Sequence, residues 1–218
     1  MFNSTVKSNK IITLIVLSLL VAGCNSAYSP KPRGYFKIEF PDRAYQQFNK
    51  PEFPYSFEYP VYATVIRDTT FFEAKPENPY WLNIDFPRFN GKIYISYNII
   101  GGKTIFKIKR KDGYIDSVGV NTFERLIKGS YELTYKHTYK ASSIEDSVFR
   151  TKYGIEGIYF RLGGNTATSN QFLLTDSVKN FLRGALYFDA TPNQDSLAIV
   201  NDFLQHDMNH LINTFQWK

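Results

Sequence analysis

The chain has 218 residues, of which 43% are apolar and 17% aromatic, and it carries a formal net charge of +6. This apolar content excludes a disordered chain, and the length fits one or two compact domains. The single cysteine, Cys24, excludes an intramolecular disulfide, a cysteine-rich zinc site and a cysteine-ligated iron–sulfur cluster.

The N-terminal segment is typical of a bacterial export signal. Lys7 and Lys10 precede an apolar run from Ile11 to Val21. A run of this length reaches about 15 Å as a helix, half of the roughly 30 Å hydrocarbon core, so it is too short to span a membrane comfortably. The basic region, the short apolar region and the small residues that follow predict a removable signal peptide over residues 1–23.

The string Val21-Ala22-Gly23-Cys24 resembles a lipobox. In that motif a peptidase cuts between the positions held here by Gly23 and Cys24, and the thiol is acylated through a thioether. Buried methylenes contribute about 0.8 kcal/mol each, so several acyl chains anchor a domain to a lipid bilayer without a spanning helix. We therefore predict Cys24 as the lipidation site. The alternative is an uncleaved membrane-anchoring segment with an incidental cysteine.

The residues after Cys24 divide into a tether and a domain. Residues 24–32 are small and polar and contain two prolines, which predicts a flexible tether, and residues 33–218 are predicted to form a single domain. Removing the signal peptide takes away two lysines and lowers the net charge to +4. So mild and scattered a charge does not indicate nucleic-acid binding.

The first half of the domain predicts extended structure. Prolines and aromatic residues crowd 34–60, which indicates segments laid over a core by their rings. Ser56 to Tyr59 and Val61 to Ile66 alternate in polarity and predict one early strand pair.

A β-hairpin is predicted next. Trp81 to Phe86 and Lys92 to Tyr97 alternate in polarity, and Asn90-Gly91 between them favours a tight turn. The basic stretch from Lys103 to Lys111 also alternates, which predicts an edge strand or hairpin arm whose lysines face water.

A helix is predicted from Asn121 to about Ser142, with Asn121 and Glu124 at the spacing of a capping box. Three strands follow, at residues 157–162, 169–175 and 181–188. Pro192 then introduces a final helix, with Thr191 and Gln194 at capping-box spacing. Its apolar seam repeats at steps of three and four: Leu197, Val200, Leu204, Met208, Leu211 and Phe215. This order predicts an α+β fold with a mostly antiparallel sheet flanked by helices.

Three histidines are the candidates for chemistry. His206 and His210 are four residues apart in the final helix, a spacing that suits a metal, yet their helical angles place them opposite the apolar seam and a third ligand is missing. His137 falls near the core-facing stripe of the first helix, where an imidazole acts as a proton switch, a general base or a packing residue. No Gly-x-Ser-x-Gly nucleophile elbow and no phosphate-binding loop occurs. We therefore expect no catalytic residue, metal or cofactor.

Several linked strings resemble the gliding-motility lipoprotein GldD family of Bacteroidetes over essentially the whole mature chain. They are residues 28–36, 57–60, 81–87, 135–141, 175–177, 181–188 and 192–197. Within them, His137, Arg183 and Tyr187 are the candidate functional or binding residues. The order of strands and helices is also similar to the Mog1/PsbP-type α/β/α sandwich.

The resemblance implies a non-enzymatic envelope lipoprotein needed for gliding motility and the associated type IX secretion machinery. Its implied partners are the bilayer, through acylated Cys24, and other gliding or secretion envelope proteins. Residues 25–35 hold no acid, and surface lipoproteins of this phylum carry an acidic run there, so we expect the domain to face the periplasm. The alternative is a periplasmic hydrolase or glycan-binding lipoprotein that uses His137 or the face with His206 and His210.

Overall fold

The computed structural model describes residues 38–68 and 78–218, and Glu39–Lys218 cluster as one unit. The expected signal peptide, the Gly23/Cys24 cleavage site, the tether and the predicted start of the domain lie outside the described residues. Their boundaries stay predictions.

A seven-stranded sheet forms the centre of the described part of the chain, and every neighbouring pair in it is antiparallel. Its order is β3 (Thr64–Arg67), β4 (Leu82–Phe86), β5 (Gly91–Ile99), β11 (Asn180–Phe188), β10 (Asn170–Thr175), β9 (Glu156–Gly164) and β8 (Ala141–Arg150). The sheet therefore combines strands from the middle of the chain with strands near its C-terminus.

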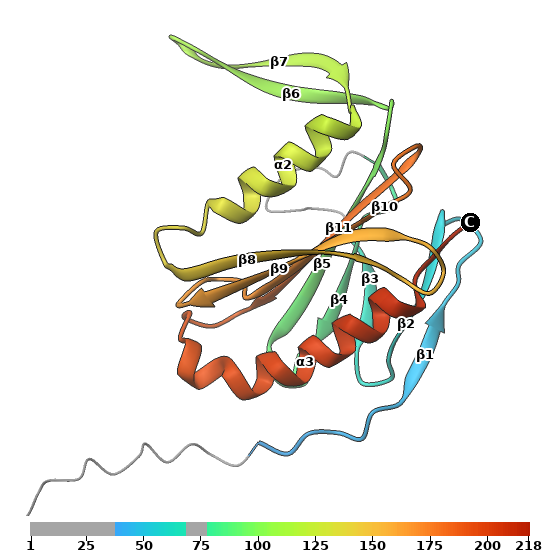
Figure 1. Cartoon of the computed structure of the whole chain (residues 1–218), viewed down its shortest axis with the longest axis vertical. Coiled ribbons are helices and arrows are strands. Elements are labelled where there is room, and N and C mark those ends of the chain that lie inside the picture. Colours follow the sequence, from blue (N-terminus) through green and yellow to red (C-terminus); the bar gives the residue numbers. More distant parts are fainter. Residues whose placement is uncertain (1–37, 69–77) are drawn as a thin grey trace, which may run out of the picture. The chain divides into compact units, whose positions relative to one another are not determined.

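Two helices cover opposite faces of this sheet (Figure 1): α2 (Phe123–Tyr135) and α3 (Gln194–Thr214). The larger apolar cluster lies between the sheet and α3, and a smaller one lies under α2. This arrangement confirms the α+β class and the mostly antiparallel sheet flanked by helices.

The predicted hairpin with Asn90-Gly91 is confirmed. β4 and β5 pair from Leu82 opposite Ile95 to Phe86 opposite Gly91, with a short 3-10 turn, η1 (Pro87–Phe89), before Asn90. Asn90 adopts a left-handed conformation with φ of 47°, which asparagine tolerates better than most residues. The three strands predicted in the second half are confirmed as β9, β10 and β11.

The prediction that residues 56–59 and 61–66 form a strand pair is wrong. β2 (Tyr55–Pro60) pairs with β1 (Tyr45–Phe48) and with β12 (Gln216–Trp217) in a separate three-stranded sheet, whereas β3 joins the main sheet. A tight turn after Pro60 redirects the chain from one sheet to the other. In this turn the Ala63 N–H donates a hydrogen bond to the Pro60 carbonyl at 3.0 Å. The predicted packing of this region's rings into a core is confirmed, because Phe48 and Phe57 are buried core residues that stack with centroids 4.9 Å apart.

The first helix is shorter than predicted. It ends at Tyr135, and His137 lies in the turn that follows rather than on the helical stripe. Residues from Ala141 onward pair with β9, so strand pairing overrides the helical pattern there. Thr122, not Asn121, is the N-cap, and its hydroxyl accepts a bond from the Arg125 N–H at 3.3 Å.

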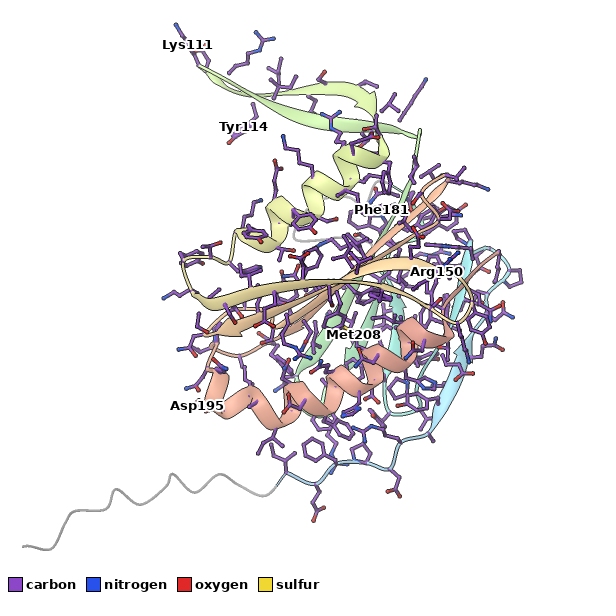
Figure 2. The ribbon with its side chains drawn as sticks, in the orientation of Figure 1. Lys111, Tyr114, Arg150, Phe181, Asp195 and Met208 are labelled. Atoms are coloured by element: carbon purple, nitrogen blue, oxygen red, sulfur yellow. The ribbon has the colours of Figure 1, made fainter. Side chains whose placement is uncertain are left out.

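The N-cap of the final helix lies two residues after the predicted one, Thr191. Asn193 is the N-cap, and its side chain accepts from the Ser196 N–H at 3.1 Å, so the proposed box of Thr191 and Gln194 is wrong. The Gln194 side chain instead accepts from the Gly164 N–H at 2.7 Å. The apolar seam is confirmed from Val200 to Phe215, and Figure 2 shows Met208 between α3 and the sheet.

The basic stretch from Lys103 is confirmed as one arm of a hairpin. β6 (Lys103–Arg110) pairs with β7 (Gly113–Val120), and these two strands form a sheet of their own among the described residues. The structure does not describe the side chains of Lys107 and Lys109, so their exposure to water stays a prediction.

Candidate functional site

Strands β4, β5 and β11 carry apolar side chains on one face and polar side chains on the other. The face toward α3 holds core residues such as Leu82, Ile93 and Leu186. Because side chains alternate along a strand, the residues between them share the opposite face. We call this set the polar face: Asn83, Asp85, Lys92, Tyr94, Ser96, Asn98, Arg183 and Tyr187.

The polar face is half-buried because α2 covers mainly the other half of the sheet. Leu126, Ile127 and Tyr131 of α2 pack near Phe160 and Leu162 of β9. Every member of the polar face has intermediate exposure. The site therefore has a firm floor of strands and remains partly open to solvent.

Arg183 is the central cation of the polar face. It lies in β11, opposite Ser96 of β5 and Leu173 of β10. Its Nη2 donates a hydrogen bond to the Oε1 of Gln171, which also accepts from the Thr134 hydroxyl at 3.0 Å. Gln171 is completely buried, so this amide is a fixed acceptor under α2.

Two neighbouring polar atoms are buried without a hydrogen-bond partner within the described ranges: the Nε of Arg183 and the Nε2 of Gln171. The Oδ1 of Asn83, two strands away on the same face, is a third. Buried polar groups normally have partners, so such a cluster indicates a place where water or a ligand completes the bonding. Burial lowers the pKa of Arg183, and the nearby Tyr187 opposes that shift.

The structure brings the three predicted site residues together. The rings of His137 and Tyr187 lie 6.5 Å apart, and Arg183 acts electrostatically on both. Burial, and then the charge of Arg183, lower the pKa of His137 below 6.5. Burial raises the pKa of Tyr187, whose ring meets Tyr94 edge-on at 5.7 Å.

Two hollows flank these residues. The first, which we call the α2 cavity, has a volume of about 600 Å³ and lies between α2 and the sheet. Arg183 and Phe181 line it, and Figure 2 shows Phe181 on the strand that faces α2. The second has a volume of about 530 Å³ and includes Lys92, Tyr94 and Tyr187. Ligand sites are hollows of this size with a few convergent polar groups.

His206 and His210 are not joined by a third candidate metal ligand among the described residues. The His210 Nε2 lies 2.6 Å from a carboxylate oxygen of Glu58, and the Tyr45 ring stacks on the imidazole with centroids 3.5 Å apart. His206 is exposed on the same helix. Within 38–68 and 78–218 no group of three or more His, Cys, Asp or Glu side chains is placed to hold a metal ion.

Asp207 is a buried residue that the sequence reasoning missed. It is 1% exposed on α3, accepts from the hydroxyls of Tyr45, at 3.0 Å, and of Tyr62, and lies 3.6 Å from the Arg43 guanidinium. These contacts fasten the N-terminal strands to α3. The available signal was its position between Leu204 and Leu211 in the apolar seam, where an acid needs partners.

The polar face was also missed as a unit. Its signal was present in the alternation of Asn83 and Asp85, and of Lys92, Tyr94 and Ser96, with buried residues. What sequence alone lacked was the register that places Ser96 opposite Arg183.

No described helix combines the length and the hydropathy needed to cross a bilayer. No curated protein matches the chain. The solution structure of cyanobacterial PsbP (CyanoP) from Synechocystis sp. PCC 6803 is similar to it, with a TM-score of 0.43 and 11% sequence identity over 87% of this chain and 99% of that one. We draw no conclusion about this chain from a likeness at that TM-score.

A family match covers almost the whole chain after the cysteine. The family described as "Gliding motility lipoprotein GldD" matches residues 25–217, which includes the entire polar face. This agrees with the resemblance of the quoted strings. The chain therefore belongs to the gliding motility lipoprotein GldD family.

Proposed function

We propose that this protein is a non-enzymatic envelope lipoprotein, anchored through acylated Cys24, that binds other envelope proteins of the gliding and type IX secretion machinery. The observation that carries the proposal is the family match, which begins at residue 25, directly after the cysteine of the lipobox. The lack of an acid in residues 25–35 favours a domain that faces the periplasm.

The β6–β7 hairpin supports a protein-binding role. Cross-strand register places Ile105 opposite Val118, and these side chains are 64% and 73% exposed. Tyr114 on the same face is 67% exposed, and Figure 2 shows it on the hairpin, further from the tip than Lys111. Apolar side chains gathered on a projecting element mark an interaction surface.

The polar face supports binding rather than catalysis. Its groups are a guanidinium, amides, an ion pair of Asp85 and Lys92 at 3.2 Å, and the phenols of Tyr94 and Tyr187, and burial raises the pKa of Tyr187. These groups recognise a ligand by charge and hydrogen bonding.

Site-specific photocrosslinking in the native bacterium tests the proposal. A photoreactive residue at Val118 should give one dominant adduct with another envelope protein. The same residue at Val178, which is 79% exposed at the β10–β11 turn, is the matched control and should give none. Absence of a specific adduct at Val118 would contradict the protein-binding role.

The hydrolase alternative predicts a different result. His137→Gln keeps the size and neutral polarity of the side chain and removes its proton chemistry. We expect this variant to glide normally. Loss of gliding at normal protein abundance would favour an enzyme that uses His137.

Membrane fractionation tests the anchor separately. Cys24→Ala should release the protein into the soluble fraction, because the apolar run before it is too short to span a bilayer. A variant that stays fully with the membrane would support the uncleaved-segment alternative.

A further inference from the structure

The lining of the α2 cavity is positively charged. Among the described residues of the lining, Arg125, Lys128 and Arg183 are cations and Glu132 is the one carboxylate. Glu132 lies 3.8 Å from Lys128, one turn away on α2, and both are well exposed. The described lining therefore holds more positive than negative groups, and Arg183 is the cation among them that is least exposed.

Arg183 is the least exposed of these three cations. Its hydrogen bond goes to a neutral amide, and none of the ion pairs found in the described residues includes it. A guanidinium removed from water without an anion is unfavourable, and charged groups in such places normally have a counter-charge. The buried Nε without a partner shows that its bonding is incomplete.

The rest of the lining is mixed: Ser96, Asn98, Asn121 and Ser130 are polar, and five larger side chains are apolar. Trp81, Leu126, Leu133 and Phe181 surround the cations, and Ile108 of the β6–β7 hairpin closes one side. A cavity with this lining favours an anionic group that is attached to an apolar body. Free inorganic anions would leave the aromatic and aliphatic wall unused.

We propose that the α2 cavity binds a carboxylate carried on an apolar segment, and that in the cell this is an Asp or Glu side chain flanked by apolar residues of a partner protein. The guanidinium of Arg183 is planar, as a carboxylate is, so the two groups match in geometry, whereas a Lys ammonium acts as a point charge. The apolar wall receives the flanking side chains. This inference rests on the proposed protein-binding function and names the chemistry that the partner presents.

The test uses the mature full-length lipoprotein in nanodiscs of uncharged phosphatidylcholine, with hexanoate as the probe. Both tryptophans carry a fluorine label, because Trp81 lines the cavity and Trp217 does not. Fluorine NMR should show a saturable shift of the Trp81 signal at hexanoate concentrations on the order of 1 mM, as suits a ligand of this size. Hexanol and hexylamine at the same ionic strength should give no saturable shift of the Trp81 signal.

Variants assign the effect to Arg183. Arg183→Met should weaken hexanoate binding by about tenfold or more, the loss expected for a charge-assisted hydrogen bond. Arg161→Met is the matched control, since Arg161 lies in β9 and lines a different cavity, and it should bind as the unmodified protein does. If Arg183→Met does not fold, the comparison of hexanoate with hexanol and hexylamine decides the matter alone.

Two results would overturn the inference: an equal response to hexanol and hexanoate, or unchanged hexanoate binding by folded Arg183→Met. Either result with an intact crosslink at Val118 would leave the protein-binding function standing and remove only the carboxylate site. Absence of a specific crosslink from the photoreactive residue at Val118, with Arg183 intact, would remove the function itself.

Discussion

Arg183 donates a hydrogen bond to the side-chain oxygen of Gln171, a fully buried amide in the neighbouring strand β10. The Thr134 hydroxyl on α2 donates to the same oxygen at 3.0 Å. Helix and sheet thus fix the amide from both sides, while the cation beside it keeps an unpaired Nε. This arrangement positions a charge without neutralising it, which suits recognition more than stability.

Replacing Arg183 should not weaken the fold. We expect Arg183→Met to leave the free energy of unfolding unchanged or to raise it by about 1 kcal/mol, because apolar groups of similar volume often replace buried charges favourably. Thr134 still satisfies the Gln171 oxygen. Chemical denaturation of the variant and of Arg161→Met measures this. A loss of more than about 2 kcal/mol would show that Arg183 stabilises the fold.

His137 should make stability depend on pH near neutrality. Burial and Arg183 lower its folded pKa, so the unfolded chain binds the proton more tightly. The contribution of the neutral ring is then complete above pH 6.5 and is lost as the pH falls from 6.5 toward the folded pKa. The free energy of unfolding of the unmodified protein minus that of His137→Gln should therefore shrink between pH 7.5 and pH 5. A difference that is constant or grows on acidification would contradict the assignment.

Asp207 should be the most sensitive acid on α3. Asp207→Ala removes the acceptor for two tyrosine hydroxyls and should cost about 3 kcal/mol, since hydrogen bonds to charged groups contribute about 1.5–3 kcal/mol each. Burial and the bond to Asp207 also raise the pKa of Tyr45 to about 12. Asp202→Ala, at an exposed position of the same helix, should change the free energy of unfolding by less than about 0.5 kcal/mol. Equal effects at the two positions would refute a fastening role for Asp207.

The hairpin should serve contact more than folding. Val118→Thr keeps the shape of the side chain, makes the exposed surface polar and should reduce co-purification of the crosslinked partner several-fold. Thermal unfolding should stay unchanged, because the side chain is 73% exposed. Val148→Thr is the control, since Val148 is 76% exposed on the edge strand β8. Equal partner recovery from both variants would argue against the hairpin as a docking element.

Local patterns predicted much of the fold. Asn90-Gly91 marked its turn, and the spacing of Val200, Leu204 and Met208 marked the buried side of α3, because both signals are contained within a few residues. The errors arose where the structure of a segment depends on pairing with residues far away in the sequence. Ala141 and Ser142 read as helix but join β8, and β2 finds its partners at Tyr45–Phe48 and Gln216–Trp217.

The site was predictable only in part. His137, Arg183 and Tyr187 were selected from strings of the chain, and the structure places them around one surface. Gln171 and Asn83 were not selected, because only the register of β10, β11, β5 and β4 shows that Gln171 lies beside Arg183 and that Asn83 lies on the same face of the sheet. The contacts of His210 with Glu58 and Tyr45 were not predicted, because these partners lie about 150 residues earlier in the chain.

The central claim, that the surface around Arg183 acts in binding during gliding rather than in folding, is tested most directly in the native bacterium. Gliding speed and protein abundance should be measured for Arg183→Met and for Arg161→Met. We predict that Arg183→Met accumulates to the normal level and does not glide, while Arg161→Met glides normally. Normal gliding by Arg183→Met at normal abundance would contradict the claim.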